Sequence, residues 1–113
     1  MTKTRWITEM GMGVDVHGND YTKAARRAVF DALRHSSLNF FHAAGKTKEQ
    51  MSVDVRIGVA KPDEVDLDTV AEEVPYGTVS VTAEIGGLDV ESPRDDGDGL
   101  VIANAAILVS FDD

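Results

Sequence analysis

Apolar and polar residues alternate in two segments of the chain, residues 51–60 and 78–85, and this period of two predicts half-buried β-strands. In the first segment, four apolar side chains share one face: Val53, Val55, Ile57 and Val59. Residues 4–12, TRWITEMGM, are rich in β-branched and large side chains and predict an earlier strand. We expect helices to cover one face of these strands.

Residues 100–111, LVIANAAILVSF, predict a last strand of a different kind, because apolar side chains occupy both of its faces. Such a strand is covered on two sides. The alanines in this segment also permit a helix, but its β-branched residues favour a strand. These residues are Val101, Ile102, Ile107 and Val109.

From Asp20 the apolar period changes to three and four residues, which predicts a helix over residues 20 to 35 or beyond. Its apolar face consists of Ala25, Ala28, Val29, Ala32, Leu33 and Ser36. Asn19 or Asp20 is placed to cap the start of this helix. A second, shorter helix is predicted in LDTVAEEV, with Asp66 as its cap.

The elements follow the order β-α-β-α-β-β, and Gly86-Gly87 indicates a bend or bulge that LDVES continues. We therefore expect a single domain over residues 1–113 with an α/β fold. More closely, it is an α+β two-layer sandwich in which a four-stranded mixed sheet carries helices on one face. The uncovered face of this sheet needs a partner subunit, so we expect a homo-oligomer.

The chain is acidic, with 20 Asp and Glu residues against 11 Lys and Arg residues and a formal net charge of −9. This balance argues against nucleic acid and against a membrane as partners, because clustered cations bind both. It fits a high-salt environment. There is no cysteine, and no apolar run is long enough to span a membrane. We expect a soluble, cytoplasmic protein.

The segment MGMGVDVHGND, residues 10–20, carries the clearest candidate chemistry. In an extended chain Asp15 and His17 would point to the same side, and Val14 and Val16 to the other. Carboxylate and imidazole are ligands of a divalent metal such as zinc. Glycines 11, 13 and 18 would permit unusual backbone angles and the close approach of a ligand. Equally, the segment fits a plain strand-to-helix turn in which Asp15 caps the helix or pairs with His17.

A metal site needs a third ligand, for which we favour His35 over His42, Asp20 and Glu9. Asp31, one turn before His35, would orient its imidazole. His35 fits a partly buried, hydrogen-bonded role as well. We expect a small-molecule ligand to contact six residues: Gly11, Gly13, Gly18, Asp20, Lys23 and Asn104. No P-loop, dinucleotide-binding or GxSxG motif is present, so we expect no nucleotide cofactor.

GMGVDVHG resembles the GxGxDxHG motif of a family of conserved proteins of unassigned function. The likeness continues through TKAARRAVFDAL, SVDVRIGVAKPDEVD, VPYG, GGL and IANAAILV, and so covers most of the chain. The resemblance implies a conserved hypothetical protein and supplies no reaction.

A shorter likeness is that of GMGVDVH to the GxGxDxH segment of methylerythritol cyclodiphosphate synthases. In these homotrimers the Asp and His of the motif bind zinc together with a later His, and the sites lie between subunits. The resemblance implies that Asp15 and His17 are metal ligands and that the oligomer is a trimer or a higher multiple. The chain departs from these enzymes in lacking an HSDGD segment; RDDGDG has no histidine. We do not infer cyclodiphosphate synthesis.

Two functions fit these observations. The first is a small-molecule or divalent-metal site at the GxGxDxHG turn, with metal-assisted hydrolase or lyase chemistry if the protein is an enzyme. The second is a non-catalytic assembly or binding module in which the glycines shape a subunit interface.

Overall fold

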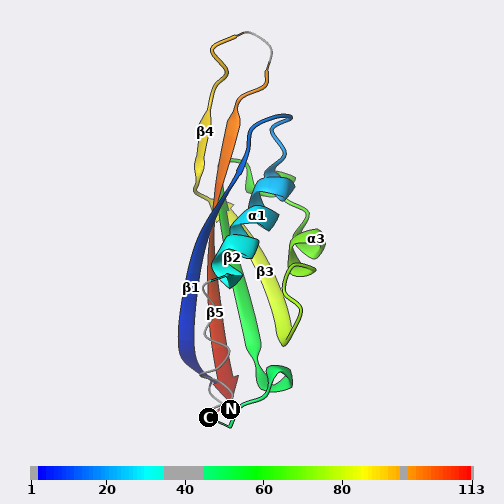
Figure 1. The fold of residues 1–113 in the computed structure, drawn as a ribbon, viewed down its shortest axis with the longest axis vertical. Helices are drawn as coiled ribbons and strands as arrows, with labels where there is room; N and C mark the ends of the chain where they lie inside the picture. Colours follow the sequence, from blue (N-terminus) through cyan, green and yellow to red (C-terminus); the bar gives the residue numbers. More distant parts are fainter. Residues whose placement is uncertain (1–2, 35–44, 95–96, 113) are drawn as a thin grey trace.

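The computed structural model describes residues 3–34, 45–94 and 97–112. Within these ranges, five strands form one sheet and two helices lie on one of its faces (Figure 1). The strands are β1 (Lys3–Asp15), β2 (Ser52–Val59), β3 (Thr78–Ile85), β4 (Leu88–Val90) and β5 (Leu100–Asp112). The helices are α1 (Tyr21–Leu33) and α3 (Leu67–Ala71), with 3₁₀ turns at Lys48–Gln50 and Pro62–Glu64. None of these helices is long and apolar enough to cross a membrane.

The sheet has the strand order β1-β5-β2-β3, and β4 pairs with the part of β5 that extends past β2. β5 is central and runs antiparallel to β1, β2 and β4, whereas β2 and β3 are parallel. The predicted mixed α/β architecture is confirmed. The predicted four strands are wrong, because β4 is a fifth strand that the order β-α-β-α-β-β leaves out.

The fifth strand arises from the glycine pair that follows β3. Gly86 donates its N–H to the Val59 carbonyl at 2.9 Å, so the chain bends across the end of β2. Gly87 has φ +63°, and a Cβ there would lie 2.1 Å from the carbonyl oxygen of Ile102. Glycine is therefore required where the chain stops pairing with β2 and begins to pair with β5. The bend was predicted; the change of partner strand was not.

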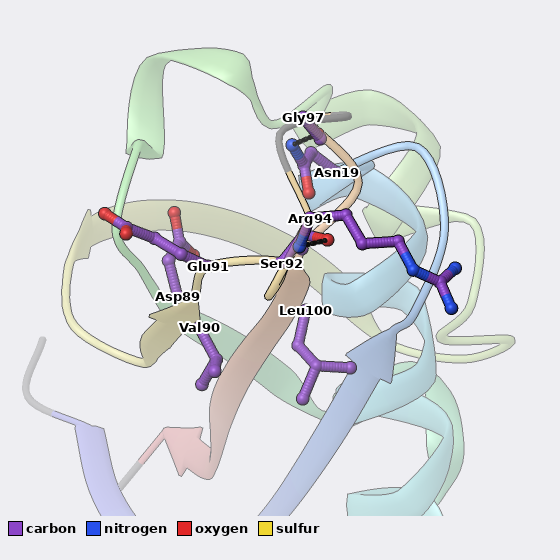
Figure 2. Close-up of a pocket in the computed structure, with 9 residues that line it drawn as sticks. Asn19, Asp89, Val90, Glu91, Ser92, Arg94, Gly97 and Leu100 are labelled. Atoms are coloured by element: carbon purple, nitrogen blue, oxygen red, sulfur yellow. Dashed lines mark hydrogen bonds between the residues drawn. The ribbon is translucent and has the colours of Figure 1, made fainter.

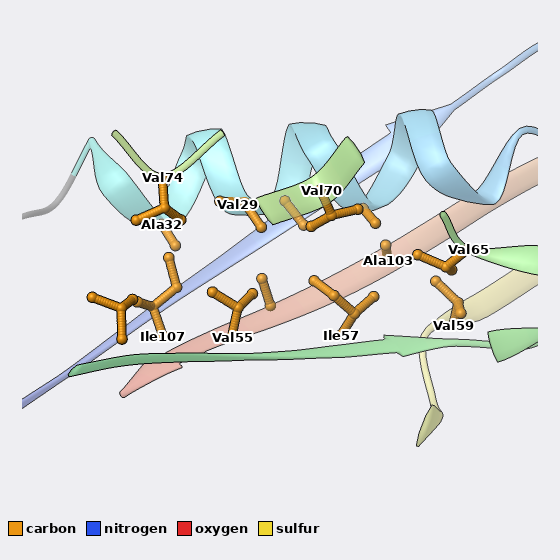
Figure 3. Close-up of a cluster of buried hydrophobic side chains, with 14 of the residues drawn as sticks. Val29, Ala32, Val55, Ile57, Val59, Val65, Val70, Val74, Ala103 and Ile107 are labelled. Carbon is orange, nitrogen blue, oxygen red and sulfur yellow. The ribbon is translucent and has the colours of Figure 1, made fainter. Parts of the chain in front are cut away.

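The core lies between α1, α3 and the inner face of the sheet (Figure 3). The residues of α1 that are buried are Tyr21, Ala24, Ala25, Ala28, Val29 and Ala32. They face the four alternating residues of β2, which are at most 1% exposed, as the sequence predicted. Val70 of α3 belongs to the same core, and α3 packs beside β3. The small side chains of α1 bring this helix close to the strands.

Both predicted helix caps are present. The Asp20 side chain accepts a hydrogen bond from the Lys23 N–H at 3.0 Å, and the Asp66 side chain accepts one from the Thr69 N–H at 3.2 Å. Each bond satisfies an N–H that has no partner within its helix. Hydrogen bonds from Thr69 also lower the pKa of the Asp66 carboxyl group.

β5 is covered on only one of its two faces by the described chain. On its inner face, every second residue from Val101 to Phe111 is at most 5% exposed. On its outer face Ile102, Ala106 and Leu108 are half-buried by neighbouring strands, and the described helices all lie on the other side. The sequence predicted that both faces of β5 are covered. The described chain covers only the inner face.

Gly11 and Gly13 set the distance between β1 and α1. A Cβ on Gly13 would lie 2.2 Å from the Ala24 carbonyl oxygen and 2.3 Å from the Ala28 nitrogen. A Cβ on Gly11 would lie 2.4 Å from backbone atoms of Ala28 and Ala32. These contacts are with backbone, which cannot move aside as a flexible side chain does. The two glycines thus allow the helix backbone to rest directly on the strand.

We expect the substitution Gly13→Ala to lower the free energy of unfolding by about 3 kcal/mol, because the added methyl group forces α1 away from β1. Urea unfolding followed by circular dichroism measures the change. Gly58→Ala is the matched control, since a Cβ there meets its nearest atom, the Gly86 Cα, at 3.5 Å. This control should stay within about 1 kcal/mol of wild type. Equal losses in the two variants would show that the close contact is not what Gly13 provides.

Candidate functional site

The GxGxDxHG segment is divided between a strand and a turn, because β1 ends at Asp15. Asp15 is 2% exposed, whereas Val16 is 47% exposed and the His17 side chain is 82% exposed. The alternation that predicted Asp15 and His17 on one side therefore stops before His17. Gly11 and Gly13 are needed for contact with α1 and not for unusual backbone angles. Gly18 does have such an angle, with φ +87°.

Asp15 joins the end of β1 to the start of α1. Its Oδ2 atom accepts a hydrogen bond from the Asp20 N–H at 2.9 Å. Its Oδ1 atom lies 3.5 Å from the Lys23 ammonium and 3.9 Å from a guanidinium nitrogen of Arg27. A buried carboxylate needs such partners to offset its lost hydration. Within the described residues, the contacts of Asp15 are those of a structural group that orients the first turns of α1.

Side chains of α1 also occupy the free edge of β1. The Arg27 guanidinium donates to the Val14 carbonyl at 2.5 Å, and the Asp31 carboxylate accepts from the Met12 N–H at 3.0 Å. Backbone groups on an edge strand are otherwise open to pairing with another chain. Asp31 was predicted to orient His35. His35 and the alternative ligand His42 both lie outside the described residues, so that prediction remains a prediction.

His17 lies in the turn after β1 and pairs with Asp98. Its Nδ1 atom is 2.8 Å from an Asp98 carboxylate oxygen, and the other oxygen accepts from the Gly18 N–H at 2.7 Å. The Asn19 side chain donates to the Gly97 carbonyl at 2.7 Å. The hydrogen bond from His17, followed by that from Gly18, lowers the pKa of the Asp98 carboxyl group. These contacts hold the turn of residues 16–20 against the residues that precede β5.

The hydrogen bond between Nδ1 and a carboxylate fixes how His17 can act. When the imidazole is neutral and Asp98 is ionised, Nδ1 donates the shared proton and Nε2 is left as an acceptor directed away from Asp98. This is the arrangement in which imidazole serves as a metal ligand or as a general base. No group of three His, Asp or Glu residues placed to hold a metal ion occurs among residues 3–34, 45–94 and 97–112. Asp15 and His17 have separate partners there.

A polar pocket of about 290 Å³ lies next to this turn, between β4 and the start of β5 (Figure 2). Asp89 and Glu91 lie on one side of it, and Arg94 extends on the other; Asn19 and Gly97 close its end. Asp89 accepts a hydrogen bond from the Tyr21 hydroxyl. Burial, followed by this bond, raises the pKa of Tyr21 to about 12. Tyr21 therefore stays neutral near pH 7 and ties α1 to β4.

The other predicted ligand-binding residues are spread over the molecule. Asp20 caps α1, and Lys23 lies one turn further along the helix beside Asp15. Asn104 is exposed on the outer face of β5, where it lines a hollow of about 340 Å³ with Met10 and Ile85. The structure thus brings together Asp15, Asp20 and Lys23, and it places Asn104 on the opposite side of the sheet.

Asp98 is the residue of this site that sequence reasoning missed. The segment PRDDGDG, residues 93–99, was interpreted only as an acidic loop. One signal was available. If the first and last predicted strands pair antiparallel, the start of the last strand lies beside the end of the first, and Asp15 does pair with Val101. An aspartate flanked by glycines just before the last strand would then fall next to His17.

Comparison with known proteins gives a family match and a similar solved structure. The model of the family Lin0512_fam, a conserved hypothetical protein, matches residues 5–109. The crystal structure of an FtsZ-like protein of unknown function from Nostoc punctiforme is similar in fold, with a TM-score of 0.90 and 35% sequence identity. The match covers 100% of this chain and 99% of that chain. No curated protein matches. The resemblance to a family without an assigned function is confirmed; the likeness to the zinc synthase stays a prediction.

We expect the Asp98 carboxyl group to titrate below the ordinary range of aspartate, and the substitution His17→Ala to raise this pKa. Because the pKa is lowered in the folded state, the bond stabilises the protein above the ordinary aspartate pKa. This contribution is lost as the pH falls through the lowered value. Carboxyl ¹³C NMR titration of the wild type and the variant measures both values. The same pKa in the two proteins would contradict the assigned bond.

Proposed function

This chain belongs to the conserved hypothetical protein family Lin0512_fam, and from that premise we propose that it is a self-associating protein. In this proposal the subunits contact each other through the outer face of the sheet, opposite α1 and α3. The FtsZ-like neighbour, whose function is unknown, is similar to this chain throughout its length. The support for self-association comes from the side chains exposed on the outer face of the sheet.

The exposure of large apolar side chains on the outer sheet face carries this proposal. Met10 on β1 is 71% exposed, and Met12 on β1 and Leu88 on β4 are more than half exposed. Between them lie the half-buried Ile102, Ala106 and Leu108 of β5. Soluble monomers rarely expose a contiguous apolar surface of this kind. A second sheet packed at about 10 Å would remove it from water.

Polar groups on the same face would set the register of such a contact. Asn104 lies in the middle of the face, and the guanidinium of Arg56 contacts the Glu84 carboxylate at 2.6 Å. Gly58 and Ala106 leave a hollow beside them, which a side chain of a second subunit can fill. Buried amide and ionic groups restrict the arrangements in which all of them are paired. This supports a defined assembly over indiscriminate aggregation.

A small-molecule or divalent-metal site at the GxGxDxHG turn is the second candidate, and the contact between His17 and Asp98 favours it. His17 would act through Nε2, either as a metal ligand such as zinc accepts or as a base for a bound molecule. A metal would need further ligands from His35, from Asp15 after a rearrangement, or from another subunit. Metal-assisted hydrolase or lyase chemistry would require such a completed site.

For the assembly, we expect analytical ultracentrifugation to give a mass above that of one chain. The double substitution Met10→Lys and Leu88→Lys should shift the population to monomers, because it places charges in an apolar contact. Leu67→Lys is the matched control. Leu67 is an exposed large apolar residue on the helical side, and its substitution should leave the mass unchanged. A monomeric wild type, or dissociation by the control as well, would refute the proposed interface.

For the site at the turn, we expect elemental analysis of protein purified from zinc-supplemented cells to find roughly one divalent ion per chain. His17→Ala should lose the ion and Asp98→Asn should weaken its binding, because Asp98 orients the imidazole. Asp54→Ala removes an exposed carboxylate on β2 and should retain the ion. If the wild type contains no divalent metal, or if His17→Ala retains it, His17 is not a ligand.

A further inference from the structure

The outer side of α1 forms a cleft that the proposed assembly does not use. Lys23, Arg26, Arg27 and Phe30 line it from the helix, and Glu73, which follows α3, lines its opposite side. We call these five residues the α1 cleft. Its volume is about 350 Å³, which falls in the lower part of the range of small-molecule pockets, roughly 300–1,000 Å³. It lies on the helical side of the molecule and so stays accessible when the outer sheet face is covered.

The α1 cleft collects positive charge on an acidic chain. Lys23, Arg26 and Arg27 are spaced by three and four residues, so their side chains share one face of the helix. Like charges in this arrangement repel one another. The cleft places these three cations around a single lining carboxylate, Glu73, while the chain as a whole has a net charge of −9. An anion bound there would relieve the repulsion.

The three cations of the α1 cleft have more hydrogen-bond donors than the carboxylates that already face them can accept from. Arg26 donates from Nε to Glu73 at 2.7 Å, and Arg27 donates from one nitrogen to the Val14 carbonyl. Lys23 lies 3.5 Å from the Asp15 carboxylate, which is the outer limit of a hydrogen bond. All three side chains are about half exposed. A guanidinium has five N–H donors, so further donors of both arginines are available for an anion, as far as the described residues show.

Phe30 supplies an apolar surface in the same cleft. Its side chain is 57% exposed and lies one turn beyond Arg26 and Arg27. The guanidinium of Arg34 lies 6.0 Å from the centre of its ring. Since Lys23 and Phe30 are seven residues apart, about 10 Å separates them along the helix axis. That length suits a molecule with an anionic group at one end and a flat apolar group at the other.

We propose that the α1 cleft binds a small aromatic phosphate. The phosphate contacts Lys23, Arg26 and Arg27, because arginine matches the geometry of phosphate oxygens with two parallel donors. The flat ring packs against Phe30. Glu73 holds Arg26 in place on the far side of the cleft and accepts a hydrogen bond from a hydroxyl or amino group of the ligand.

Saturation-transfer difference NMR with phenyl phosphate tests this site on the full chain. We expect saturable binding of phenyl phosphate, no saturable binding of phenol, and displacement by inorganic phosphate only at about tenfold higher concentrations, a ratio of affinities worth about 1.4 kcal/mol. Binding of phenol that equals that of phenyl phosphate would overturn the role of the cations. Equal affinity for inorganic phosphate and phenyl phosphate would overturn the role of Phe30.

Substitutions in the α1 cleft test whether phenyl phosphate binds there. Arg26→Gln should weaken phenyl phosphate binding by about tenfold or more, as expected for a lost charge-assisted hydrogen bond. Lys23→Gln should weaken it as well, and Phe30→Ala should reduce the affinity to that of inorganic phosphate. Arg56→Gln is the matched control, because it removes another half-exposed arginine from a close pair with a glutamate, on the opposite face of the sheet. Binding that survives Arg26→Gln and Lys23→Gln, or that Arg56→Gln reduces equally, would overturn the proposal.

Discussion

The direct contact between the backbones of α1 and β1 is the constraint on which the rest of the structure depends. It exists because positions 11 and 13 have no side chain, and Ala24, Ala28 and Ala32 have small ones. At this distance the buried Asp15 carboxylate reaches the Asp20 N–H, and Arg27 and Asp31 reach the free edge of β1. The first half of the motif that suggested a ligand site, Gly11 and Gly13, allows α1 to pack directly against β1.

This placement of α1 decides which surfaces remain for function. The helices cover the inner face of the sheet, so the second apolar face of β5 is left uncovered by the described residues. The end of β1 and the start of β5 extend together beyond the helical layer, and they carry the turn with His17 and Asp98 (Figure 1). The outer side of α1 carries cations that its inner contacts with Asp15 only partly neutralise. The proposed assembly face, the proposed site at the turn and the α1 cleft thus lie on three different surfaces.

Local periodicity predicted much of the fold, because an element buried on one face has apolar residues at regular spacing in the sequence. The alternation in β2 and the cap Asp66 were predicted correctly, and of the two caps predicted for α1, Asn19 and Asp20, the structure uses Asp20. Four residues of the predicted apolar face of α1 are buried, Ala25, Ala28, Val29 and Ala32, whereas Ser36 lies outside the described residues. The fifth strand was missed because Gly86-Gly87 indicates a bend without indicating which strand the chain joins next. The role of Gly11 and Gly13 and the pairing of His17 with Asp98 depend on contacts between distant segments, which spacing along one segment does not encode. Asp15 was predicted as a metal ligand, and this stays a prediction; its described partners are a backbone N–H and two cations.

Through its bonds to Asp20, Lys23 and Arg27, Asp15 fastens α1 to β1. Urea unfolding of wild type, Asp15→Asn and Asp15→Ala, each with added zinc and with a chelator, tests this role. We expect Asp15→Ala to lower the free energy of unfolding by about 1–3 kcal/mol, since the Asp20 N–H loses its buried acceptor. Asp15→Asn should lose less, because its amide oxygen can still accept that bond, and the chelator should not change these differences. A wild type that the chelator destabilises to the level of Asp15→Ala would show that Asp15 acts through a bound metal instead.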